Sequence, residues 1–188
     1  MAKPFERIED VHRAFVEKQK IFFTASAADG TRVNLSPRGT DMFRVMSPNA
    51  VLWLDKTGSG NETAAHLVAD GRLTVMFCAF EGPPMILRFY GRGRVVGRGT
   101  PDWATLLAIE FDGVEPPGAR QMVWLDIDLV QTSCGFAVPF FDHVGPRDTL
   151  DRWASSKSAE ELDAYRRQKN TVSMDGLPTG IFPPDDHE

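Results

Sequence analysis

Two short stretches of the sequence carry residue types that suit the binding of a phosphate group. Residues 34–39 read Asn-Leu-Ser-Pro-Arg-Gly, and residues 56–63 read Lys-Thr-Gly-Ser-Gly-Asn-Glu-Thr. The guanidinium of Arg38 presents a planar fork of donors that matches phosphate oxygens. In the second stretch, small residues expose backbone N–H groups, and a helix that begins near Asn61 would turn its positive end toward an anion.

Neither stretch is decisive by itself. A solvated arginine on a loop is the commoner case for a residue such as Arg38. Residues 56–63 lack both the Gly-Lys-Ser/Thr ending of a P-loop and the three-glycine spacing of a dinucleotide fingerprint. A plain loop followed by a helix cap explains them as well as an anion site does.

Other reactive residue types form no recognisable constellation. The histidines lack the spacing of metal ligands, so we expect no metal site; they are His12, His66, His143 and His187. Cys134 has no identifiable base near it, and a free cysteine commonly packs as a small hydrophobe. Cys78 and Cys134 form no Cys-x-x-Cys pair, which favours a reducing, cytoplasmic location over a disulfide scaffold.

The composition is that of an ordinary globular protein. The chain has 188 residues, 42% of them hydrophobic and 25% charged, which predicts one domain over residues 1–188. A formal net charge of -5 disfavours nucleic acid as a partner. The N-terminus is charged, and no apolar run approaches the roughly 20 residues that span a bilayer, so we expect neither export nor membrane insertion.

The elements that must position these residues are mostly strands. Apolar and alternating runs predict strands at residues 21–27, 31–35, 42–46, 51–55, 72–80, 85–96 and 121–130. Helices are predicted over the first twenty residues, over 61–69, from Thr100 onward and over 158–169. So many consecutive strands favour an antiparallel barrel over a doubly wound sheet. The fold class is therefore mainly β with flanking helices (α+β), followed by a helical and irregular C-terminal extension from about residue 140.

Taken in order, several segments resemble the flavin-binding core of the pyridoxamine 5'-phosphate oxidase-like proteins. The resemblance covers roughly residues 5–140. It is carried by residues 36–39, 55–63, His66-Leu67, Gly71-Arg72, Thr74, Met76-Phe77, 88–94 and 131–139. It implies an antiparallel split β-barrel of the FMN-binding type, with FMN held at the interface of a homodimer.

The resemblance also implies which residues meet the cofactor. The FMN phosphate would be held by side chains at matching positions, which are Arg38, Ser59, Asn61 and Thr63. The flavin ring would lie against strand backbone near Asn34, Ser36, Trp53, Leu54 and Asp55. Residues 135–139 would approach it from one subunit or the other.

Two departures from the family pattern bear on function. The true oxidases commonly carry an Arg-Lys pair at the helix opening, where this chain has Glu62-Thr63. They also end in a segment that contains Trp and Arg, whereas residues 170–178 here read Asn-Thr-Val-Ser-Met-Asp-Gly-Leu-Pro. We therefore expect an FMN-dependent oxidoreductase of unknown substrate that does not oxidise pyridoxamine phosphate, and we assign no catalytic residue.

Two alternatives remain open at this point. One is a flavin-binding protein without turnover, used in stress or redox signalling. The other is a split barrel that accepts a deazaflavin or haem in place of FMN, because fold alone does not settle function.

Overall fold

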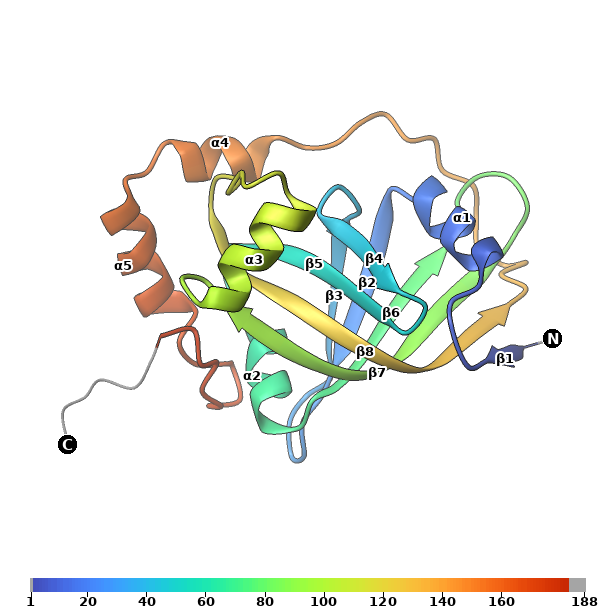
Figure 1. The fold of residues 1–188 in the computed structure, drawn as a ribbon, viewed down its shortest axis with the longest axis horizontal. Coiled ribbons are helices and arrows are strands. Elements are labelled where there is room, and N and C mark those ends of the chain that lie inside the picture. Colours follow the sequence, from blue (N-terminus) through green and yellow to red (C-terminus); the bar gives the residue numbers. More distant parts are fainter. Residues whose placement is uncertain (1, 183–188) are drawn as a thin grey trace.

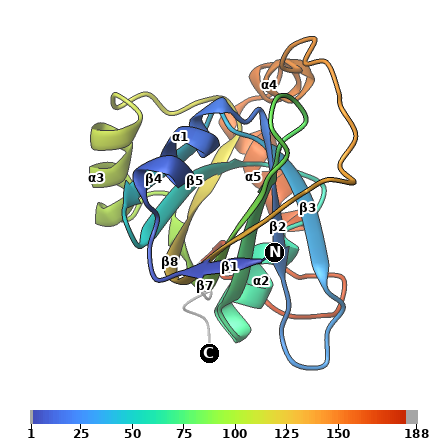
Figure 2. The ribbon, with the colours of Figure 1, turned by 90° about the vertical axis from the view of Figure 1, so that its right-hand side faces the viewer.

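The computed structural model describes residues 2–182, and its strands pair antiparallel in one curled sheet (Figures 1 and 2). The strand order is β3-β2-β6-β7-β8-β5-β4, with β1 paired to β8. The strands are β1 (Lys3–Phe5), β2 (Ile21–Ser26), β3 (Asn34–Gly39), β4 (Phe43–Ser47), β5 (Ala50–Lys56), β6 (Arg72–Cys78), β7 (Ile86–Gly97) and β8 (Ala119–Ser133).

Helices flank this sheet (Figure 1). They are α1 (Asp10–Lys18), α2 (Glu62–Ala69), α3 (Pro101–Glu110), α4 (Thr149–Ser155) and α5 (Ala159–Lys169). The expected fold class, mainly antiparallel β with flanking helices, is confirmed. None of the helices described here is long and apolar enough to cross a membrane.

Two of the helices begin at the positions that their capping residues predict. The Thr100 side chain accepts a hydrogen bond from the Trp103 amide at 3.2 Å, and Pro101 occupies the first helical position of α3. Ser158 and Glu161 form the reciprocal capping box that opens α5. These helix starts are set by local chemistry, which is why the sequence indicates them.

The predicted N-terminal helix is wrong for residues 2–9, and residue 1 lies outside the described residues. Residues 2–9 do not extend the helix, which begins only at Asp10; instead β1 pairs with β8, with Phe5 opposite Val130. The reason lies in the sheet, because β5 covers that edge of β8 only as far as Asp126. The uncovered backbone groups of β8 are paired by β1, which satisfies them.

The strand predicted at residues 31–35 is also a correction, because it begins and ends later, at Asn34–Gly39, and so includes residues 36–39. They belong to β3, which runs opposite β2 with Arg38 facing Phe22 in the register. Pro37 is tolerated because β3 lies at the edge of the sheet. Because side chains alternate along a strand, Asn34, Ser36 and Arg38 lie on one face of β3. Leu35 and Pro37 lie exposed on the other face.

Two apolar clusters lie on the two faces of β5. Val51 and Trp53 belong to the first, which is dominated by edge-to-face aromatic rings such as Phe22 against Phe43, 4.8 Å apart. Leu52 and Leu54 belong to the second, beneath α3. Residues 50–54 are therefore apolar on both sides, and Asp55 enters the interior at the end of the strand.

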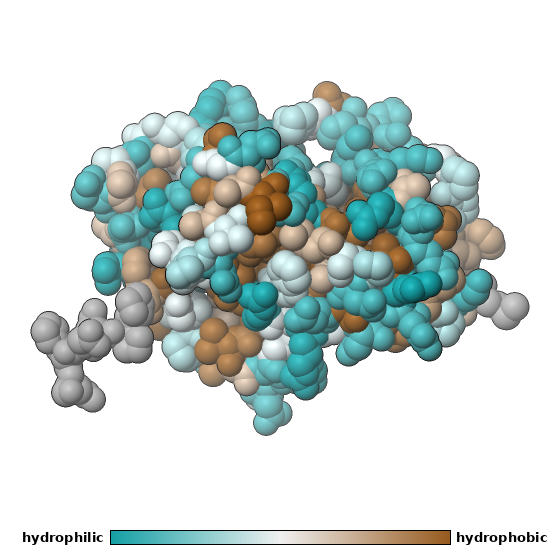
Figure 3. All heavy atoms as spheres, viewed as in Figure 1, coloured by the Kyte–Doolittle hydropathy of each residue, from teal (hydrophilic) through white to brown (hydrophobic). Residues whose placement is uncertain are grey.

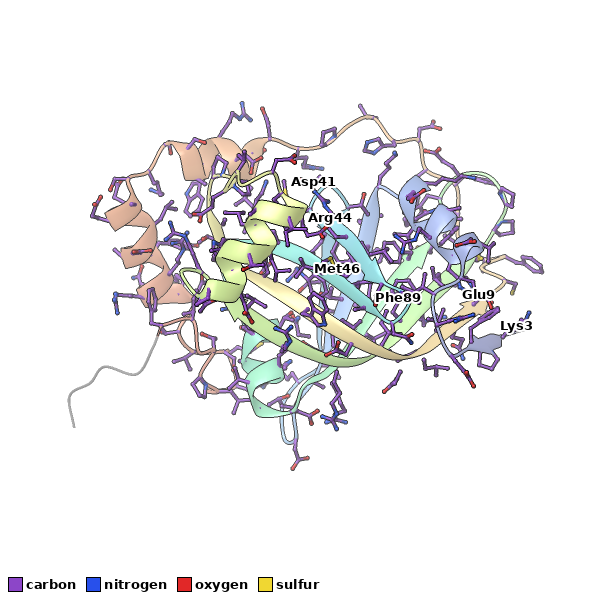
Figure 4. The ribbon with its side chains drawn as sticks, viewed as in Figure 1. Lys3, Glu9, Asp41, Arg44, Met46 and Phe89 are labelled. Atoms are coloured by element: carbon purple, nitrogen blue, oxygen red, sulfur yellow. The ribbon has the colours of Figure 1, made fainter. Side chains whose placement is uncertain are left out.

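Close backbone packing and side-chain contacts complete the framework around the sheet. Any side chain on Gly91 of β7 would collide with the carbonyl oxygen of Asp126 at the β-bulge, so only glycine fits there. Arg44 donates to the carbonyl oxygens of Asp41 and Glu110, which ties the start of β4 to the end of α3 (Figure 4). These contacts fix β7 against β8 and β4 against α3, and β5, which carries part of the predicted site, pairs with both β4 and β8.

Candidate functional site

A groove of about 2330 Å³ runs along β3, the end of β5 and the loop that precedes α2. Its far wall includes residues 80–85 and the irregular segment between β8 and α4. Figure 3 shows the opening beneath this segment, which crosses the top of the view. Every residue predicted to bind the cofactor lines this groove: Asn34, Ser36, Arg38, Trp53, Leu54, Asp55, Ser59, Asn61 and Thr63. The structure thus brings the two stretches together, while their role toward FMN stays a prediction.

Asp55 lies at the centre of a buried ion-pair network beside the groove. Its Oδ2 accepts from Nε and Nη2 of Arg120 at 3.1 and 2.9 Å, and its Oδ1 lies 3.3 Å from Nη2 of Arg38. Gln121 adds a further hydrogen bond to Oδ2 at 3.0 Å. A carboxylate paired with two guanidinium groups leaves the network with one excess positive charge, which suits an anionic ligand.

Burial alone raises the pKa of Asp55, because a charged carboxylate loses its hydration in the interior. The guanidinium groups of Arg120 and Arg38, together with the hydrogen bonds from Arg120 and Gln121, outweigh this effect and hold the pKa of Asp55 below its ordinary value. Asp55 is therefore ionised, and both of its carboxylate oxygens are already paired with donors of the protein.

Asn61 is engaged in the same way. Its side chain is buried and makes a reciprocal amide pair with Gln121, whose Nε2 donates to Asn61 Oδ1 at 2.8 Å. The Asn61 Nδ2 donates in turn to Gln121 Oε1 at 3.3 Å. The side-chain amide of Asn61 therefore holds the loop against β8. Only the backbone N–H of Asn61 remains available to a ligand.

The loop before α2 presents backbone donors that the protein leaves free. The carbonyl oxygens of Gly58 and Gly60 accept hydrogen bonds from Asn170 and Arg120. Among the described residues, in contrast, no protein acceptor takes a hydrogen bond from the amides of residues 59–63. Asn61 does not cap α2 with its side chain, so the positive end of that helix is open to an anion.

The polar side chains of β3 lie against the start of α2. Asn34 Nδ2 donates to Thr63 Oγ1 at 3.1 Å, and Ser36 Oγ donates to Asn34 Oδ1 at 3.3 Å. Because Thr63 accepts from Asn34, its own hydroxyl hydrogen remains available as a donor. Ser59 is exposed on the loop itself.

Two further donors of the groove are buried and have no protein acceptor. They are Nε of Arg38 and Nε1 of Trp53, and the Arg38 guanidinium carbon lies 6.0 Å from the centre of the Trp53 ring. Buried donors are almost always hydrogen-bonded in proteins, so unpartnered ones beside a groove indicate a ligand with acceptor atoms. Leu54 also borders the groove, but it is buried and packs in the second apolar cluster on the other face of β5 from Trp53.

Glu62 is directed toward the C-terminal segment. Its Oε2 accepts a hydrogen bond from the Met174 amide at 3.1 Å. This contact accounts for an acidic residue at the opening of a helix that otherwise presents free donors.

Sequence reasoning missed the residues that support the loop from behind. Arg120 stands just before the predicted strand at 121–130, and Asn170 and Arg166 belong to a segment that had no assigned role. Arg166 is buried and donates to Thr57 Oγ1 and to the Ala119 carbonyl, both at 2.9 Å. The one available signal is the polar pair Arg120-Gln121 at the start of an otherwise apolar strand.

Comparison with known proteins shows the family to which the chain belongs. Residues 8–134 match the family model described as pyridoxamine 5'-phosphate oxidase. The pyridoxamine 5'-phosphate oxidase family protein ustO of Aspergillus flavus is 39% identical over 191 residues, which covers 93% of this chain and 76% of that protein.

Solved structures show the same fold at low sequence identity. A putative pyridoxamine 5'-phosphate oxidase from Lactobacillus delbrueckii superposes with a TM-score of 0.52 at 16% identity, covering 67% of this chain and 94% of that one. A variant of HupZ from Group A Streptococcus gives a TM-score of 0.53 at 11% identity, covering 67% and 99%. The predicted split β-barrel is therefore confirmed, and the chain belongs to the pyridoxamine 5'-phosphate oxidase family.

Proposed function

We propose that this protein binds FMN in the groove and uses it as an oxidoreductase on a substrate other than pyridoxamine phosphate. The observation that carries the proposal is a set of donors without protein acceptors that line the same groove, namely the backbone amides of residues 59–63 and Nε of Arg38. Backbone amides at a helix N-terminus together with a guanidinium make a phosphate site.

The chain's own residues divide into two groups around such a ligand. The phosphate would be held by the amides of residues 59–63, by Arg38 and by the hydroxyls of Ser59 and Thr63. Asn34, Ser36 and the indole N–H of Trp53 would face the ring system along β3 and β5. When bound, the flavin supplies hydride or electron transfer, while the protein binds and orients it.

A homodimer is part of the proposal. The groove is open, and exposed apolar side chains lie on β3 and on the segment after β8, both of which contribute residues to its lining: Leu35, Phe136, Phe140 and Phe141. Exposed apolar groups of this size gain free energy when a partner covers them. We expect a dimer interface of about 2,000 Å² or more, measurable as twice the chain mass in light scattering. The two free cysteines fit a reducing, cytoplasmic location.

The first experiment identifies the cofactor. Purified protein should be yellow, with the two absorption bands of a flavin, and should release FMN on denaturation. Bleaching by a reduced nicotinamide cofactor would support turnover, whereas a flavin that resists reduction would favour a binding protein. Release of a deazaflavin or haem would contradict the proposal.

The second experiment removes the phosphate contact. Arg38→Ala should weaken FMN binding by about one to two decades, because a charge-assisted hydrogen bond to phosphate is lost. Affinity for riboflavin, which has no phosphate, should change little. The matched control is Arg98→Ala, which alters an exposed ion pair with Glu115 outside the groove. Equal losses of FMN and riboflavin affinity in Arg38→Ala would instead assign Arg38 to folding.

A further inference from the structure

The segment that follows α5 reaches the back of the loop that precedes α2. Asn170 is fully buried there, and its Nδ2 donates to the Gly58 carbonyl at 3.0 Å. Its Oδ1 accepts from Nη1 of Arg120 at 3.0 Å, and its own carbonyl accepts from Thr179 Oγ1 at 2.6 Å. Every polar group of this side chain therefore has a defined partner.

Arg120 acts on the same loop from β8. Its Nη1 donates to the Gly60 carbonyl at 2.8 Å, while Nε and Nη2 are held by Asp55. The side chain is only 5% exposed, so its orientation is fixed by these partners. Two alternate carbonyls of the loop, those of Gly58 and Gly60, are thus drawn toward the protein interior.

This arrangement dictates where the intervening N–H groups point. In a trans peptide the C=O and the following N–H lie on opposite sides of the chain, and no cis peptide bond occurs among the described residues. Fixing the Gly58 and Gly60 carbonyls inward therefore turns the amides of Ser59 and Asn61 outward, where they have no protein acceptor. These are donors that the proposed phosphate site requires.

We propose that Asn170 and Arg120 are positioning residues for the flavin phosphate, and that they act through the backbone of residues 58–61. Asn170 does not line the groove, and the guanidinium of Arg120, which borders it, is already held by Asp55, Gly60 and Asn170. The inference rests on the proposed function, and it gives the C-terminal segment a part in cofactor binding. The unpartnered donors of Arg38 and Trp53 in the same groove are independent support for a ligand there.

The test is the ratio of FMN affinity to riboflavin affinity, measured by flavin fluorescence titration. Asn170→Ala removes the donor to Gly58 and should lower FMN affinity about tenfold while riboflavin affinity stays within twofold. Inorganic phosphate, used as a competitor of FMN, should compete less well in the variant than in the unchanged protein. Far-UV circular dichroism and urea unfolding verify that the variant is folded.

A matched control lies in the same segment. Ser173 is also buried, but its side chain accepts only from the Leu177 amide and does not contact the loop. Ser173→Ala should therefore leave the affinity ratio unchanged even if it loosens the segment. A fall in the ratio for both variants would overturn the inference, because it would show a general effect of the C-terminal segment.

A second variant approaches the loop from the other side. Arg120→Lys keeps a cation beside Asp55 but cannot reproduce the fork that also reaches Gly60, so it too should lower the ratio. An unchanged ratio in folded Asn170→Ala or Arg120→Lys would overturn the positioning role while leaving the proposed function intact. Unchanged protein that binds neither FMN nor riboflavin would overturn the proposed function itself.

Discussion

The two helices nearest the ends of the described chain dock on the sheet in different ways. Around α1, Ile8 and Val16 enter the first apolar cluster, and Phe15 packs against it. Around α5, the buried groups are polar instead: Arg166 donates to Thr57 and Ala119, and Asn170 donates to Gly58. Burial of apolar surface holds α1 on the sheet, whereas hydrogen bonds from buried polar side chains hold α5 and the residue that follows it.

The difference matters because apolar contact is non-directional, whereas each buried donor needs one acceptor in one place. The polar contacts around α5 lie directly behind the loop with the free amides, where the orientation of the backbone decides which groups face a ligand. The apolar end supports the sheet, where contact area counts. The two kinds of docking should therefore fail differently when single residues are changed.

The largest effect should come from the polar end. Arg166→Met keeps a long apolar stem but leaves the Thr57 hydroxyl and the Ala119 carbonyl without their donor in the interior. We expect a loss of about 2–4 kcal/mol in the free energy of unfolding, measured in urea. Arg167→Met, on the exposed side of the same helix, should cost less than about 0.5 kcal/mol. Equal losses would mean that α5 does not dock through Arg166.

A smaller effect is expected at the apolar end. Val16→Ala removes two buried methyl groups from the contact between α1 and the first cluster, and should cost about 1–3 kcal/mol in the same assay. Val11→Ala changes an exposed valine of the same helix and is the control. Because alanine is the better helix former, Val11→Ala should change the stability little or raise it slightly. Similar losses in the two valine variants would contradict a specific role for the burial of Val16.

The smallest effect should appear with pH. Burial lowers the pKa of His12 on α1, and this outweighs the opposing influence of Glu9. The unfolded chain then binds protons more readily, so stability should fall as the pH drops through the ordinary value of 6.5 toward the lower folded pKa. Asp55 also has a lowered pKa, but its contribution is lost only in stronger acid, below its ordinary value of 3.8.

The pH prediction separates the two ends. Between pH 7.5 and 5, urea unfolding should show a stability slope that becomes flatter in His12→Asn, which cannot titrate. The polar network around Asp55 should be unaffected in this range. Identical slopes in both proteins would show that His12 does not link α1 to pH.

Much of the fold was predictable because its signals are local. Alternation in β2 and β6, the Thr100 cap and the Ser158 capping box each depend on residues within a few positions of one another. β1 was missed because its pairing depends on an edge of β8 that β5 leaves free. The predicted strand at residues 31–35 stops short of residues 36–39 because Pro and Gly favour turns, although an edge strand also accepts them.

The candidate site shows the same division. Arg38, Ser59 and Thr63 stand in recognisable stretches, so the sequence indicated them and the structure places them in one groove. Arg120 and Asn170 were not foreseen, because their partners are backbone carbonyls far away in the sequence. A segment that docks through polar side chains shows no periodic pattern of hydrophobic residues in its sequence. For this reason the sequence assigns no role to the C-terminal segment.

The position of β8 in the chain has a consequence for synthesis. β8 is the last strand in the sequence, yet it pairs with β1, β5 and β7. Lys3 of β1 lies opposite Thr132 of β8. The sheet therefore cannot close until β8, which ends at Ser133, has left the ribosome, and the edges of earlier strands stay unpaired until then. Pairing across such sequence separations is slow, in the range of milliseconds to seconds. Nascent chains of this protein should thus depend on chaperones more than a helical protein of equal length does.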